Sequence, residues 1–221
     1  MSRRQTISEQ RWPNTGDFVK LANALQTKAV ITLLNLVWKA YDLLLTEVLS
    51  QVDSTQSDAD LERQITQLLE PRIHRVMDGA EPFFVQHNSY ELESRKAAPA
   101  QPPEYDIAFV LHQNERIKWP VEAKVLRTQQ NTTEYVRSVT QQFLTCRYAP
   151  FSSQAAMLGY LLSGSPQIFL SNAANQIGCA IDPNPDFPNR DHGVSNHIRV
   201  IPTGKAYPVE FKCHHLILPI P

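Results

Sequence analysis

The chain has 221 residues, 42% of them hydrophobic, and carries a formal net charge of −1 with a pI near 6.7. This length and apolar content are enough to bury one full core with one appendage. The near-neutral charge excludes a protein that grips nucleic acid through an overall basic excess, so such binding needs a local basic patch or a partner. The three cysteines, Cys146, Cys179 and Cys213, form no CxxC pair and indicate free thiols in a reducing compartment.

The first part of the chain predicts an N-terminal arm and helical extension over residues 1–57. The arm is polar, and Asn14 or Thr15 can cap a helix that runs from about Asp17 toward Val52. The middle of this helix is apolar on nearly every side, so it must be covered on both sides. An extra layer packed on the rest of the chain and an interface with a second copy or a partner protein both satisfy it. The apolar residues are Val30, Ile31, Leu33, Leu34, Leu36, Val37, Leu43, Leu44 and Leu45.

The N-terminal segment does not predict export or membrane insertion. Arg3 and Arg4 are followed by polar residues, whereas a signal peptide continues with an apolar core. The longest apolar run, from Ala29 to Trp38, is bounded by lysines and is too short to cross a bilayer. We therefore expect a cytoplasmic protein with no membrane contact.

Residues 58–77 predict an amphipathic helix. Asp58 and Asp60 suit its first turn, and Glu62 lies next to its apolar side. Pro71 either kinks this helix or starts a second short one. The apolar side repeats at helical spacing through Leu61, Ile65, Leu68 and Leu69.

Three strands are predicted next, at residues 83–86, 105–110 and 119–126, and the last two contain an Asp, a Glu and a Lys. Side chains alternate across a strand, so Glu122 and Lys124 share one face and Ala123 faces the other way. If the two strands are neighbours, Asp106 lies beside Glu122. The two carboxylates and the Ala123 carbonyl oxygen are ligands that suit Mg²⁺, for which Mn²⁺ substitutes.

Lys124 lies one pleat away from Glu122 and can hold an attacking water or offset charge on a pentavalent phosphorus. This combination predicts metal-assisted hydrolysis of phosphodiester bonds. The plainer alternative places Asp106 in a turn before its strand and Glu122 and Lys124 on a solvated face of an edge strand.

In this helix–strand–strand–strand context, Asp106, Glu122 and Lys124 resemble the motif of the PD-(D/E)xK nuclease superfamily, the restriction-endonuclease-like fold. The resemblance implies that Asp106 and Glu122 bind metal and that Lys124 serves the nucleophilic water. It also implies a further acidic residue from the preceding helix, here Glu62. Tyr105 stands where that family usually has a proline. The implied fold is an α/β core with a central mixed β-sheet flanked by helices.

The resemblance extends beyond the motif and implies a nuclease-like domain over residues 58–221. Segments 134–150, 156–160, 195–199 and 214–218 look like bacterial restriction-like proteins linked to phage defence or mobile elements. The expected function is that of a Mg²⁺-dependent endodeoxyribonuclease that hydrolyses DNA in a bacterial defence or restriction system. The alternative is a non-catalytic nucleic-acid-binding or assembly subunit that retains the fold.

The remaining polar residues give less specific predictions. Met157 is expected in a helix ending near Ser163, and Cys146 in another helix as a small buried residue. His197 and Arg199 share one face of a predicted strand, where Arg199 either clamps a phosphate or, as we favour, holds the loop at residues 181–193. Basic residues near the motif form a candidate DNA-binding patch, although each alone is more often a solvated surface charge: Arg63, Arg72, His74, Arg75, Arg127, Arg137 and Arg147.

Overall fold

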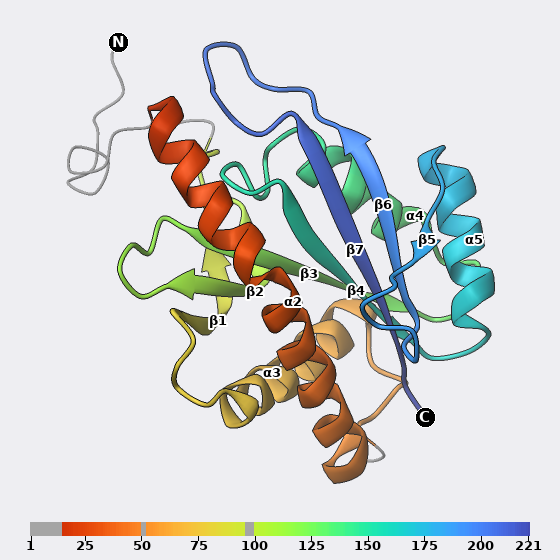
Figure 1. Ribbon diagram of the computed structural model, residues 1–221. Coiled ribbons are helices and arrows are strands. Elements are labelled where there is room, and N and C mark those ends of the chain that lie inside the picture. Colours follow the sequence, from red (N-terminus) through yellow and green to blue (C-terminus); the bar gives the residue numbers. More distant parts are fainter. Residues whose placement is uncertain (1–14, 50–51, 96–99) are drawn as a thin grey trace.

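The structure is a computed structural model that describes residues 15–49, 52–95 and 100–221. It is an α/β fold with one open, mixed, seven-stranded sheet in the order β1-β2-β3-β4-β7-β6-β5 (Figure 1). This confirms the predicted α/β class and the mixed sheet flanked by helices. The strands are β1 Phe83–Tyr90, β2 Glu104–Leu111, β3 Lys118–Leu126, β4 Gln154–Leu161, β5 Asp182–Pro183, β6 His192–Ile198 and β7 Glu210–Pro219.

At strand β3 the pairing in the sheet changes from antiparallel to parallel. Strands β1, β2 and β3 form an antiparallel meander, whereas β3, β4 and β7 run parallel to one another. Strands β6 and β5 complete the sheet with antiparallel pairing. As a result, β3 has an antiparallel neighbour on one side and a parallel neighbour on the other.

The strands that carry the predicted motif are confirmed, and each extends one or two residues beyond its predicted limits. The strand predicted from Phe83 continues to Tyr90. The predicted helix containing Met157 is wrong, because this segment is the parallel strand β4. Both faces of β4 are buried, and a strand buried on both faces reads as a continuous apolar run that resembles a buried helix.

Within the described part of the chain, two helices precede the sheet, α2 at Gly16–Glu47 and α3 at Asp58–Val76. The side chain of Thr15 accepts a hydrogen bond from the N–H of Phe18 at 3.2 Å, which confirms one of the two predicted caps. The predicted extension of α2 to Val52 is wrong, since Val48 already has non-helical dihedral angles. Pro71 lies inside α3 without interrupting it.

The other helices follow the motif. Helix α4, Thr133–Arg137, continues into the π-helical segment η2, Ser138–Phe143, and α5 spans Pro166–Ile177. Cys146 lies in a turn after η2 with φ 58°, so its predicted helical position is wrong, although it is buried as expected.

The sheet separates two apolar clusters. The cluster on one face includes α2, α3 and the side chains of Val121 and Ala123 of β3. The cluster on the other face includes residues of α4, η2 and α5 together with Leu126. Because side chains alternate, Glu122 and Lys124 belong to the face with α4, η2 and α5.

Helix α2 is covered largely by its own chain. Leu33, Leu36, Val37 and Leu44 are at most 4% exposed, and Leu45 packs partly buried against the same cluster. The apolar character of these side chains was the reason to predict a partner chain. Because the chain itself buries them, they do not require a partner. The homo-oligomer or protein partner itself stays a prediction.

Helix α2 is also the one helix, within the described ranges, that is long and apolar enough to cross a membrane. Half of its most apolar window is buried inside the molecule. Length and composition of this kind are shared by core helices and by N-terminal signal sequences, so the cytoplasmic location stays a prediction.

Candidate functional site

The site lies where the hydrogen-bonded ladder between β2 and β3 ends. The last pair in the β2–β3 register is Ile107 with Val121, and from Val121 onward β3 pairs with β4. One residue beyond that pair, Oδ2 of Asp106 accepts a hydrogen bond from the backbone N–H of Ala123 at 2.7 Å. The Asp106 side chain therefore takes the place of the next ladder bond and is fixed against β3.

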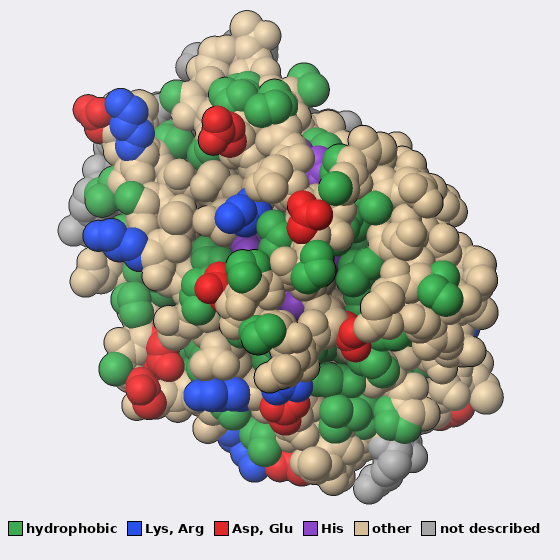
Figure 2. Space-filling model, turned by 45° about the vertical axis from the view of Figure 1, so that its right-hand side comes forward, with side chains coloured by type: hydrophobic (Ala, Val, Ile, Leu, Met, Phe, Trp, Pro, Cys, Tyr) green, Lys and Arg blue, Asp and Glu red, His purple; other side chains and the backbone are tan. Residues whose placement is uncertain are grey.

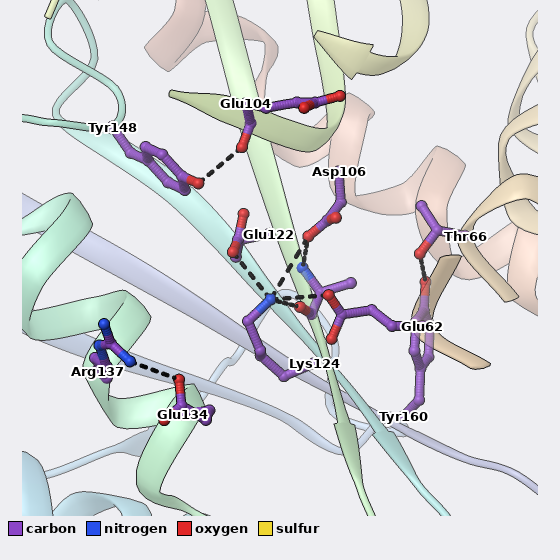
Figure 3. Close-up of polar contacts among 11 residues, drawn as sticks. Glu62, Thr66, Glu104, Asp106, Glu122, Lys124, Glu134, Arg137, Tyr148 and Tyr160 are labelled. Atoms are coloured by element: carbon purple, nitrogen blue, oxygen red, sulfur yellow. Dashed lines mark hydrogen bonds and ion pairs between the residues drawn. The ribbon is translucent and has the colours of Figure 1, made fainter. Parts of the chain in front are cut away.

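Lys124 lies at the centre of the predicted residues (Figure 3). Its Nζ is 3.0 Å from Oε1 of Glu62, 3.0 Å from Oε1 of Glu122 and 4.0 Å from Oδ2 of Asp106. The same ammonium donates a hydrogen bond to the carbonyl oxygen of Ala123. The structure thus brings together Glu62, Asp106, Glu122, Lys124 and the Ala123 carbonyl, which come from α3, β2 and β3.

The cluster is poorly solvated and unbalanced in charge. The side chain of Glu122 is 8% exposed, those of Lys124 and Glu62 are 19% exposed and that of Asp106 is 25% exposed. Three carboxylates therefore share one ammonium in a largely buried space. Such an arrangement favours either protonation of a carboxylate or a further cation.

The pKa values of the cluster follow from this environment. Burial raises the pKa of Glu62 to about 7, and the charge of Asp106 adds to this while Lys124 opposes it. Burial also raises the pKa of Glu122 well above its ordinary value, with a further contribution from Asp106. Burial alone would lower the pKa of Lys124, but the three carboxylates outweigh it and the pKa lies above its ordinary value. Lys124 is therefore a permanent cation in this site.

The donor set fits a hard divalent metal, although the side chains are arranged around Lys124. Within the described residues, no three His, Cys, Asp or Glu side chains form a ready metal-binding group. However, Oε2 of Glu122 is buried and has no hydrogen-bond partner. A buried carboxylate oxygen without a donor is costly, and a cation would satisfy it. Asp106, Glu122 and the Ala123 carbonyl are the oxygen ligands available for Mg²⁺ or Mn²⁺.

Two tyrosines beside the cluster were not identified from the sequence. The hydroxyl of Tyr148 donates to the carbonyl oxygen of Glu104 at 2.7 Å, and that of Tyr160 contacts Thr66 at 3.0 Å. Burial raises the pKa of Tyr148, and the nearby charges of Glu122 and Asp106 raise it further. No local motif marks either residue, because their proximity to the site depends on long-range packing.

The predicted basic patch is largely neutralised by carboxylates within the chain. Figure 2 likewise shows acidic and basic side chains interspersed on one face of the molecule. Six of the seven predicted basic residues contact a carboxylate: Arg72 and Arg75 contact Glu47, and Arg63, His74, Arg127 and Arg137 contact Asp60, Glu70, Asp58 and Glu134. Each of these side chains therefore already has an acidic neighbour within the chain.

Arg199 has a structural position, as favoured from the sequence, but it holds a different segment. Its guanidinium donates to the carbonyl oxygens of Ala149 and Ser152, each at 2.9 Å, and of Tyr148 at 3.3 Å. It therefore fixes residues 148–152, and the prediction that it holds residues 181–193 is wrong. His197 contacts the Ser195 hydroxyl at 2.7 Å.

Comparisons with protein-family models, curated proteins and solved structures find no match for this chain.

Proposed function

We propose that the protein is a metal-dependent nuclease of the PD-(D/E)xK type that hydrolyses DNA phosphodiester bonds in a bacterial defence or restriction system. The observation that carries this proposal is the convergence of Asp106, Glu122, Lys124 and the Ala123 carbonyl at the point where β2 leaves β3. A direct hydrogen bond there joins Asp106 to Ala123, two residues on separate strands and 17 positions apart in the sequence.

Asp106 and Glu122, with the Ala123 carbonyl, would hold Mg²⁺, which supplies Lewis-acid activation of water and of the phosphate. The N–H of Ala123 keeps the Asp106 carboxylate in position. Lys124, a permanent cation, stabilises negative charge on the phosphate or holds the attacking water. Oε1 of Glu62 accepts a hydrogen bond from Lys124, so Glu62, whose pKa is about 7, can hold a proton on its other carboxylate oxygen.

A second candidate function is a non-catalytic nucleic-acid-binding or assembly subunit. One observation favours it: the ammonium of Lys124 lies 3.0 Å from Glu122 and 4.0 Å from Asp106, the two carboxylates that would bind metal. If these ion pairs persist when metal is supplied, the cluster is a structural element of the fold and performs no chemistry.

Cleavage of DNA under single-turnover conditions tests the proposal. The wild-type protein should cut DNA with Mg²⁺ or Mn²⁺, and EDTA should abolish the activity. Lys124→Ala and Asp106→Ala should each reduce the rate by about a hundredfold or more. Lys118→Ala is the matched control, because Lys118 lies on the same strand and bonds Ser89 and the Tyr90 carbonyl instead of the cluster.

Equal cleavage by Asp106→Ala and wild-type protein would show that the activity comes from a contaminant and would refute the assignment. Metal-independent DNA binding by a wild-type protein that never cuts would establish the non-catalytic alternative.

A further inference from the structure

Tyr105, the residue directly before Asp106, joins three segments of the chain. Its side chain is fully buried, and its hydroxyl donates to Oε2 of Glu91 at 2.6 Å. The same hydroxyl oxygen accepts a hydrogen bond from the N–H of Ala149 at 3.1 Å. One side chain thereby links β2 to the segment that follows β1 and to the turn that follows η2.

Tyr148 makes the reciprocal connection. Its hydroxyl donates to the carbonyl oxygen of Glu104, two residues before Asp106 (Figure 3). The rings of Tyr105 and Tyr148 meet edge to face, with centroids 4.9 Å apart and an interplanar angle of 79°. The two tyrosines therefore tie the backbone on the N-terminal side of Asp106 to residues 148–149 by two hydrogen bonds and one ring contact.

The segment at residues 148–149 is itself held firmly. Ala149 has φ 51°, a left-handed conformation that residues with a Cβ rarely adopt, so surrounding contacts must maintain it. Arg199 supplies such contacts through the carbonyl oxygens of Tyr148 and Ala149. The tyrosine pair thus connects Asp106 to an anchored segment on the same face of the sheet as Glu122 and Lys124.

Asp106 itself is not paired in either strand ladder. In the described strands, the register of β2 with β1 passes from Tyr105 to Ile107, and the register with β3 begins at Ile107. Asn88, which would lie opposite Asp106 on β1, has φ 52° and is left out of the pairing. The carboxylate is therefore carried by a residue that lies in a gap of the β1–β2 ladder and one residue beyond the end of the β2–β3 ladder.

We propose that Tyr105 and Tyr148 are positioning residues that hold the Asp106 carboxylate against the N–H of Ala123, and hence at the reaction centre. The link to catalysis rests on the proposed nuclease function, whereas the link to Asp106 does not. A displacement of about 1 Å at a reacting group can reduce a rate by about a hundredfold, so loss of either hydroxyl should be visible in the rate.

The substitutions Tyr105→Phe and Tyr148→Phe remove one hydroxyl each and keep the rings. Tyr135→Phe is the matched control, since the Tyr135 side chain is equally buried and its hydroxyl contacts His215 at 3.0 Å. The first measurement is amide hydrogen exchange in the metal-free protein, expressed as the rate at Ala123 relative to Val125 on the same strand. This ratio cancels any uniform loss of stability.

We expect the exchange ratio to rise about tenfold in Tyr105→Phe and in Tyr148→Phe and to stay unchanged in Tyr135→Phe. We also expect the single-turnover rate at saturating DNA to fall about tenfold or more, with the half-saturating DNA concentration within about twofold of wild type. A constant exchange ratio in both variants would overturn the proposal, as would a change confined to DNA affinity.

If Tyr105→Phe fails to fold, Tyr148→Phe decides the question, because it removes only a bond to a backbone carbonyl. If the wild-type protein does not cleave DNA, the nuclease proposal fails while the exchange ratio still supports or overturns the link between the tyrosines and Asp106.

Discussion

Replacing Lys124 with methionine tests whether the carboxylates form one charge-coupled cluster. The ammonium lies 3.0 Å from Glu62, 3.0 Å from Glu122 and 4.0 Å from Asp106, and all four side chains are at most 25% exposed. Removing one partner of a buried ion pair costs about 3–5 kcal/mol, and the partial exposure here favours about 3 kcal/mol. For a chain of this size, that corresponds to a fall in melting temperature of about 6–12 °C.

The loss in Lys124→Met should depend on pH and on metal. At pH 8 the carboxylates must ionise without their counter-charge, whereas at lower pH they accept protons, so the difference from wild type should shrink as the pH falls. A divalent cation at a hundred times its dissociation constant adds about 2.7 kcal/mol and should restore most of the melting temperature. Thermal unfolding in EDTA, Mg²⁺ and Mn²⁺ at pH 6 and pH 8 measures both effects.

Lys118→Met is the control for this experiment. Lys118 lies on the same strand, and its ammonium bonds Ser89 and the carbonyl oxygen of Tyr90. This variant should lose stability without any gain from divalent metal beyond that of wild type. The reasoning is refuted if Lys124→Met and wild type melt at the same temperature in EDTA at pH 8, or if divalent metal leaves the melting temperature of Lys124→Met unchanged.

Two further predictions concern stability. In the metal-free protein, the pKa of Glu62 is about 7 in the folded state against 4.5 in the unfolded state. The folded protein is therefore most stable, as far as Glu62 is concerned, below pH 4.5, and it loses this contribution as the pH rises through about 7. Urea unfolding should show a decline of up to about 3 kcal/mol from Glu62 over that window, and Glu62→Gln should remove this share of the decline. Arg199→Met should cost about 3 kcal/mol or more, because three backbone carbonyls lose their buried donor. Arg63→Met, whose side chain is 57% exposed and pairs with a similarly exposed Asp60, should stay within about 0.5 kcal/mol of wild type in the same urea titration.

Local patterns were sufficient to predict the strands that carry the site. The ends of β2 and β3 are predicted to within two residues from the alternation of side chains around Asp106 and Glu122 and from the prolines before β2. The spacing of Glu122 and Lys124 on one face follows directly from strand geometry. Only the pairing of β2 with β3, a long-range fact, had to be assumed.

Other features depended on information that local sequence does not carry. Strand β4 was mistaken for a helix, because burial on both faces removes the alternation that identifies strands. The apolar circumference of α2 allowed either a partner chain or cover by the rest of the chain, and the sequence alone could not choose between them. The structure covers α2 mainly with α3, and residues as distant as Leu216 and Leu218 belong to the same apolar cluster. Tyr148 could not be identified as a residue of the site from local sequence, because its contact with Glu104 joins positions 44 residues apart.

Calorimetric titration with Mn²⁺ tests most directly the central claim that Asp106 and Glu122 hold a divalent metal beside Lys124. Wild-type protein should bind Mn²⁺, Asp106→Ala and Glu122→Ala should each weaken the binding about tenfold or more, and Lys124→Ala should retain it. Equal affinity in all four proteins, or no heat of binding in the wild type, would contradict the claim.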